Sequence, residues 1–215
     1  MKDKITIDVP TQWSDVSVHK FHEYTGLVRE DYKSDIHYTA KVASVLCGID
    51  VTNIPQDVFV TVANELSFLS TPISTEKVEE IEIDGDIYRW KGNLNQITVG
   101  EMISIEQIID LEKLFYNETY DVIAAVLLRK VNKDGTLEQF DSGKFSKYRD
   151  MFMELPITDL YGTVNFFIAG GKICTGHSVN YLVRIMSTPM STQKKSWLSR
   201  KLSEVKGIIT QHSNG

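Results

Sequence analysis

A histidine pair near the N-terminus is the one place where the sequence could hold a metal ion. His19 and His22 lie three residues apart, with Glu23 beside them. In a helical segment the two imidazoles would share one face and could supply two metal ligands. The surrounding spacing offers no third or fourth ligand. We therefore expect ordinary surface or half-buried histidines, and we predict no metal and no other cofactor.

Two further motifs resemble parts of catalytic sites. Gly170-Gly-Lys172 is followed by isoleucine and lacks the upstream spacing of a phosphate-binding loop. His177 and Ser178 are neighbours in sequence, and adjacent side chains on a helix do not face each other. The sequence contains no Gly-x-Ser-x-Gly elbow. We predict that the protein is not an enzyme and has no small-molecule substrate. The alternative is an enzyme whose site combines residues distant in sequence.

Acidic residues gather between residues 79 and 86, where they alternate with apolar ones. They lack the Asp-x-Asp-x-Asp-Gly order of a calcium-binding loop, so we interpret them as a solvated acidic face. The longer segment 78–118 contains ten acidic and three basic residues, a net charge of −7. An acidic surface therefore follows directly from the composition of this segment.

The clearest functional signal is a basic amphipathic stretch near the C-terminus, after the linker-like residues 187–193. Its apolar residues recur at helical steps, and from residue 189 onward five basic residues stand against one acid, a net charge of +4. We predict that this stretch binds a partner. The predicted contact residues are Trp197, Leu198, Arg200, Lys201, Leu202, Val205 and Ile209.

The apolar side of this stretch needs a cover, because burying one large apolar side chain contributes roughly 1.5–3 kcal/mol. Three covers are open: the acidic body of the same chain, a groove of a partner protein, or a membrane or nucleic acid. The whole chain carries −6, so the residues before 189 carry −10. A nucleic-acid binder would normally be basic, and the longest apolar run, 122–128, is too short to cross a bilayer. We predict a protein surface as the cover, and a membrane surface or nucleic acid stays the third alternative.

Length and composition are those of an ordinary folded protein: 215 residues, 42% hydrophobic and 24% charged. Two cysteines, Cys47 and Cys174, sit among apolar neighbours and predict reduced core thiols. Lys2 and Lys4 are not followed by an apolar run, so we expect no signal peptide and a location in the cytoplasm of the cell that makes the protein.

Apolar spacing predicts helices that begin near Ser17, Ser34 and Pro55, the second of them ended by Gly48. Thr98-Val-Gly-Glu101 matches a capping box that opens another helix.

The second half is predicted to be almost wholly helical. Residues 120–130 are apolar nearly all round, which predicts a central helix capped by Asn117. Two more helices should begin at Ser142 and Pro156, and the second should end at Gly170-Gly171.

A small antiparallel sheet is predicted between the two helical sets. Residues 78–83 and 87–90 flank Asp84-Gly85, a pair that favours a tight hairpin turn because that turn requires positive φ. Residues 95–98 could add a third strand, and residues 5–9 could form a short edge strand.

These elements predict a mostly helical α+β fold. We expect a helical body over residues 1–188, with the hairpin inserted at about 78–98. A linker and a basic amphipathic helix would then occupy residues 189–215.

Several stretches in a fixed order also carry a resemblance. They are Asp35–Ile49 followed by Ile54-Pro55, Glu65–Pro72, Ile97–Glu106, Ala124–Arg129, and Met153–Pro156 ahead of Asn165–Ile168. Together, over about residues 9–170, they resemble small proteins encoded in the structural gene blocks of tailed bacteriophages, some of them grouped with tail-assembly chaperones.

The resemblance implies a non-enzymatic assembly factor that holds a virion component, such as a tape-measure chain or a tail-tube subunit, until it is incorporated. Its partners would be other phage structural proteins, met in the host cytoplasm during assembly. The alternative is a permanent component of the virion, such as a connector, ring or internal cargo protein. The resemblance carries over no catalytic residue, and it fixes no oligomeric state.

Overall fold

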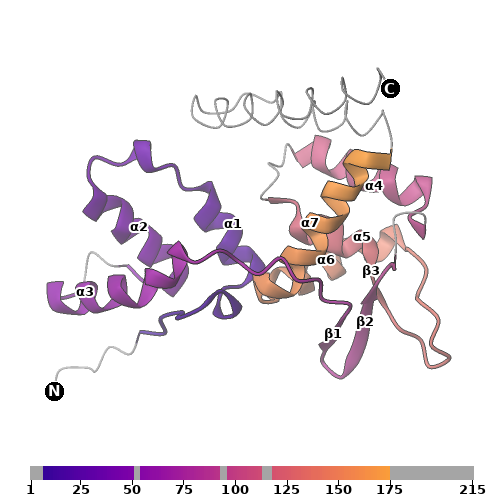
Figure 1. Cartoon of the computed structure of the whole chain (residues 1–215), viewed down its shortest axis with the longest axis horizontal. Coiled ribbons are helices and arrows are strands. Elements are labelled where there is room, and N and C mark those ends of the chain that lie inside the picture. The colour runs from indigo at the N-terminus through magenta and orange to yellow at the C-terminus, as the bar shows by residue number, and fades with distance from the viewer. Residues whose placement is uncertain (1–6, 51–53, 93–95, 113–117, 175–215) are drawn as a thin grey trace, which may run out of the picture.

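The computed structural model describes residues 7–50, 54–92, 96–112 and 118–174. These residues form seven α-helices and one three-stranded antiparallel sheet, which confirms the mostly helical α+β fold. The helices are α1 (Val18–Gly26), α2 (Asp35–Cys47), α3 (Gln56–Glu65), α4 (Val99–Glu112), α5 (Tyr120–Leu127), α6 (Phe145–Met153) and α7 (Ile157–Cys174). The strands are β1 (Glu80–Ile83), β2 (Asp86–Trp90) and β3 (Leu128–Lys130). Helices α1–α3 lie at one end of an elongated molecule, and α4–α7 with the sheet lie at the other (Figure 1).

Local capping chemistry places the first helices where the sequence predicts them. The Ser17 and Ser34 hydroxyls accept hydrogen bonds from the backbone N–H groups of Lys20 and His37. These bonds satisfy N–H groups that would otherwise lack a partner at the helix starts. Gly48 ends α2 in the left-handed conformation, with φ of 66°. The predicted starts and stop are confirmed.

The hairpin is also confirmed. Asp84 and Gly85 have φ values of 51° and 81°, as a two-residue turn with a right-handed strand twist requires. Ile83 pairs with Asp86 directly across this turn, so β1 and β2 are joined by the shortest common connection.

The third strand is not where the sequence predicts it. Residues 96–98 form no strand, and residue 95 lies outside the described residues. Instead β3 pairs with β2, matching Tyr88 with Lys130 and Trp90 with Leu128. The predicted helix over 120–130 therefore ends at Leu127. An apolar run fits a buried strand as well as a buried helix, and the free edge of β2 supplies backbone partners that no local pattern reveals.

Three other boundaries need correction or lie outside the described residues. Residues 7–9 form no strand, so the described part of the predicted edge strand 5–9 is absent. Helix α7 continues through Gly170-Gly171 to Cys174, because glycine weakens a helix by only about 1 kcal/mol and does not compel it to end. The predicted cap Asn117 is not described. Thr119 is the residue that precedes α5.

Helix α5 is the centre of the larger end of the molecule. Every one of its eight residues is buried, and it packs against α4, α6 and α7. This confirms the prediction of a central helix from its nearly uniform apolar composition. Cys47 is a buried free thiol, as predicted, whereas the side chain of Cys174 lies outside the described residues.

Two sets of hydrogen bonds, one between backbone groups and one from a side-chain hydroxyl, connect the two ends of the elongated molecule. The N–H of Val18 donates to the Leu155 carbonyl at 2.9 Å, and the N–H of Ile157 donates to the Val16 carbonyl at 2.8 Å. The extended segment that leads from α3 to β1 crosses α7 (Figure 1). There the buried Thr163 hydroxyl bonds both the N–H and the carbonyl of Val78, at 3.0 and 2.9 Å.

Candidate protein-binding site

The predicted contact residues between Trp197 and Ile209 lie outside the described residues, so their role stays a prediction. Gly170-Gly-Lys172, which lacks the spacing of a phosphate-binding loop, lies within α7 in helical backbone.

Helix α4 presents the most unusual surface among the described residues. Its inner face, which includes Glu101, Ile105 and Ile109, is buried, and the helix packs against α5. Its outer face carries Val99, Met102 and Ile103, which expose 76%, 41% and 45% of their surface. A helix with one buried face normally carries polar residues on the other. Here the outer face is apolar as well.

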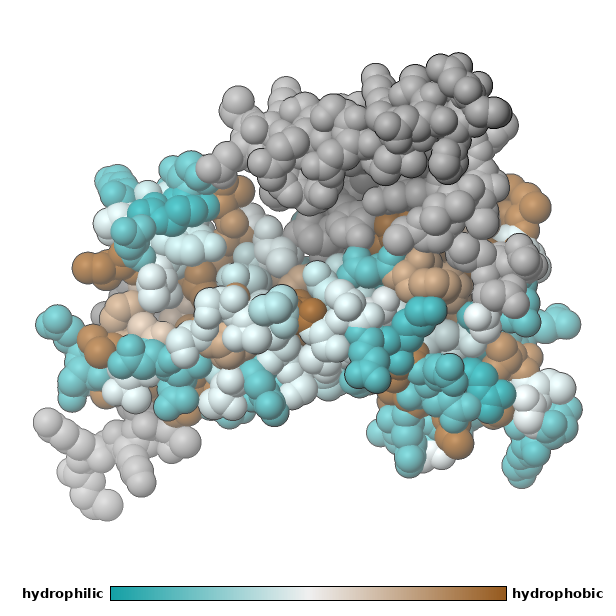
Figure 2. Space-filling model, in the orientation of Figure 1, coloured by the Kyte–Doolittle hydropathy of each residue, from teal (hydrophilic) through white to brown (hydrophobic). Residues whose placement is uncertain are grey.

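We call Val99, Met102, Ile103 and Glu106 the outer α4 face. These residues occupy positions i, i+3, i+4 and i+7 of the helix, so they form a continuous stripe on one face. Glu106 is exposed and adds a negative charge at one end of the stripe. On the side shown in Figure 2, hydrophobic residues lie in small groups between broader hydrophilic areas. An exposed apolar stripe with an acidic end suits a segment that is both apolar and basic.

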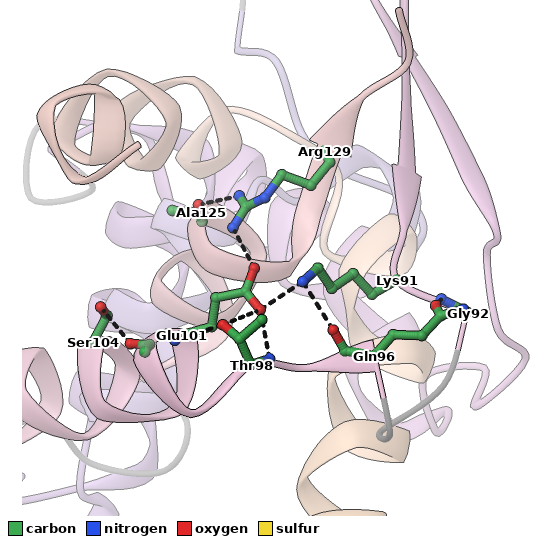
Figure 3. Close-up of polar contacts among 9 residues, drawn as sticks. Lys91, Gly92, Gln96, Thr98, Glu101, Ser104, Ala125 and Arg129 are labelled. Atoms are coloured by element: carbon green, nitrogen blue, oxygen red, sulfur yellow. Dashed lines mark hydrogen bonds and ion pairs between the residues drawn. The ribbon is translucent and has the colours of Figure 1, made fainter. Parts of the chain in front are cut away.

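A buried polar network fixes the start of α4. Thr98 and Glu101 form the predicted capping box: the Thr98 N–H donates to Glu101 Oε2 at 2.8 Å, and the Glu101 N–H donates to Thr98 Oγ1 at 3.2 Å. The same carboxylate also binds two cations. Lys91 Nζ lies 2.6 Å from Oε2, and Arg129 Nη2 lies 3.3 Å from Oε1 (Figure 3).

This network links three elements, because Lys91 directly follows β2 and Arg129 lies in β3. Arg129 also donates to the Ala125 carbonyl at 3.0 Å, and its guanidinium lies 4.9 Å from the centre of the Phe140 ring. The orientation of α4 relative to the sheet is therefore fixed by charged hydrogen bonds inside the molecule.

The electrostatics of Glu101 follow from its partners. Burial alone would raise its pKa, but the hydrogen bonds from Lys91 and Thr98 outweigh burial and lower the pKa of the carboxyl group. Burial lowers the pKa of Arg129, yet a guanidinium remains charged at physiological pH. Glu101 is therefore a carboxylate paired with two cations. The sequence pattern predicted its capping role but not the two cations, which come from distant parts of the chain.

An open pocket of about 540 Å³ lies elsewhere, beside α1. His22 is mostly buried there, and its Nε2 atom lies 4.0 Å from Oδ1 of the fully buried Asp121. Neither of these two atoms has a hydrogen-bond partner among the described residues, whereas Asp121 Oδ2 accepts a hydrogen bond from Arg149. The pocket is lined by His19, His22, Glu23, Gly26, Leu27, Lys41, Val45, Glu118 and Arg149.

Burial lowers the pKa of His22, although the nearby Asp121 and Glu118 charges act in the opposite direction. The histidine is therefore neutral near pH 7. His19 lines the same pocket, and its Nε2 atom lies 4.0 Å from Oε2 of Glu23. Over the described ranges, no group of three or more His, Cys, Asp and Glu side chains is placed to hold a metal ion.

Comparisons with known proteins return no match to a family model, to a curated protein or to a solved structure. In the part of the chain that the structure describes, no helix is both long enough and apolar enough to cross a membrane.

Proposed function

We propose that this protein binds other polypeptides and serves as an assembly factor for bacteriophage structural proteins, in the manner of a tail-assembly chaperone. The outer α4 face is the observation that carries the proposal. Val99, Met102 and Ile103 expose apolar surface on a helix whose position is fixed by the Glu101 network. Water-exposed apolar surface on a rigid element is typical of an interaction site.

The chemistry of this face fits an unassembled client. Apolar side chains of the client would bury Met102 and Ile103, and basic residues of the client would meet the exposed Glu106. Binding to the client's unassembled form would lower its free concentration, which limits aggregation before incorporation. The assignment to phage assembly is supported by the resemblance of the ordered stretches between residues 9 and 170.

Co-expression with the structural proteins encoded beside its gene tests the proposal. We expect at least one of them to co-purify with the full chain. The double variant Met102→Glu, Ile103→Glu should reduce that recovery by about tenfold or more, because it places charges where apolar contacts form. Val60→Glu is the matched control, since Val60 is 50% exposed on α3. Absence of any co-purifying protein, or equal loss in variant and control, would contradict the proposal.

A second experiment separates the alternative of a permanent virion component. Mass spectrometry of purified particles should find the protein absent, or present in trace amounts, if it is a chaperone. Many copies per particle would instead identify a structural component, and the chaperone part of the proposal would then be wrong.

The pocket beside His22 is the observation that favours an enzyme as a second candidate. A neutral, mostly buried imidazole next to a carboxylate could act as a general base. The pocket lining contains no serine, threonine or cysteine that the base could activate. Turnover of a small molecule by the purified protein, abolished by His22→Gln, would favour this candidate over the binding function.

A further inference from the structure

The outer α4 face and the C-terminal stretch have complementary chemistry. The face offers Val99, Met102 and Ile103 with the exposed Glu106 at one end, on a helix that contains no basic residue. Residues 194–209 offer five large apolar side chains at helical steps among five basic residues. The apolar side chains of the two surfaces can cover each other, and their charges have opposite sign.

We propose that residues 194–209 occupy the outer α4 face of their own chain in the free protein, and that a client displaces them. The inference rests on the proposed function, since it assigns a regulatory segment to the same binding surface. The segment acts as an internal competitor that covers the apolar face until a client is present.

The connection is long enough for this contact. Helix α7 ends at Cys174, and 19 residues separate it from Lys194. A connection of that length spans about 30 Å if it is wholly helical, as the expected helical body over 1–188 implies for most of it, and up to about 60 Å if it is extended. Either length is enough to reach α4, because α5 contacts both α4 and α7 and packed helices lie about 8–10 Å apart. A tethered segment also has a high effective concentration, so modest intrinsic affinity is enough to keep it bound.

Internal competition weakens client binding by a defined amount. The apparent dissociation constant equals the intrinsic constant divided by the fraction of molecules in which the face is free. If that fraction is about one in ten, removal of the competitor strengthens client binding by about tenfold. The charged part of the contact is screened by salt, so added salt should increase the free fraction.

Hydrogen exchange of the full-length protein, followed by mass spectrometry, tests the contact from both sides. Leu202→Asp should speed exchange of α4 amides by about tenfold. Ser203→Asp is the matched control, because it adds the same charge one residue away, on the opposite side of the predicted amphipathic helix. Conversely, Met102→Glu with Ile103→Glu should speed exchange in residues 194–209, whereas Val60→Glu should not.

The exchange rates of the variants decide whether residues 194–209 cover the outer α4 face. Reciprocal changes that are independent of protein concentration support the proposal, and unchanged exchange in α5 shows that the variants remain folded. Exchange in α4 that is unaffected by Leu202→Asp overturns it. Protection that appears only as concentration rises also overturns it, because a second copy is then the occupant. In either of these cases, client capture that still depends on Met102 and Ile103 leaves the proposed function standing.

Discussion

Glu101 and Arg129 form an ion pair inside the molecule, with 3.3 Å between Oε1 and Nη2 and with only 3% and 2% of their side chains exposed. Lys91 binds the other oxygen of the same carboxylate at 2.6 Å. One acidic side chain thus holds a cation from β3 and a cation that directly follows β2 against the first turn of α4. The outer α4 face depends on this arrangement, because the network sets which side of the helix is buried.

Loss of this carboxylate should strongly destabilise the protein. Glu101→Ala leaves the buried Arg129 without its ionic partner, and removal of one member of a buried pair costs about 3–5 kcal/mol. Denaturant unfolding of the variant should show that loss. Glu80→Ala is the control, since the Glu80 pair with Arg89 is about half exposed and should contribute at most about 1 kcal/mol. Equal losses in the two variants would contradict the structural role of Glu101.

Acidification should destabilise the folded protein through His22. Burial holds the folded-state pKa of His22 below its ordinary value near 6.5, so the unfolded chain takes up the proton first. The contribution of neutral His22 to the free energy of unfolding is fully present above about pH 6.5 and is lost as the pH falls through the folded-state pKa. His22→Gln should flatten the unfolding free energy over this interval. The variant keeps the neighbouring charges of Asp121, Glu118 and Arg149. If the unfolding free energy of the variant depends on pH as steeply as that of the unmodified protein, His22 is not the source of the pH dependence.

Gly162 on α7 should not tolerate replacement by any residue that has a Cβ atom. A Cβ atom added to Gly162 would lie 1.9 Å from the backbone oxygen of Glu76, in the segment that crosses the helix. Backbone cannot move aside as a flexible side chain can, so Gly162→Ala should cost about 3 kcal/mol or more. Gly100→Ala is the matched control on α4, where the nearest atom is 3.9 Å away, and it should be neutral or stabilising by about 0.5 kcal/mol. Equal melting temperatures for the two variants would contradict the close packing of Gly162 against the backbone of Glu76.

Features that depend on neighbouring residues could be predicted from the sequence. Ser17, Ser34 and the Thr98–Glu101 box cap helices through bonds to residues three positions away, and Asp84-Gly85 sets its own turn. These interactions are local, so the residue types and their spacing are enough to indicate them.

Features that depend on distant partners could not be predicted. β3 forms because β2 offers a free edge, and no pattern within 128–130 distinguishes that outcome from one more helical turn. The outer α4 face was missed for a related reason. Helix α4 is apolar on both sides, so periodicity alone does not indicate which side is exposed. The binding role of residues 197–209 stays a prediction.

Site-specific photo-crosslinking from Met102 tests the central claim most directly. A photoreactive residue is placed at position 102 of the full chain, in cells that also express the neighbouring structural proteins, and at position 60 as the comparison. We predict a covalent adduct with a structural protein from position 102 and none from position 60. No adduct with any polypeptide at position 102, or the same adducts from both positions, would contradict the claim that α4 binds clients.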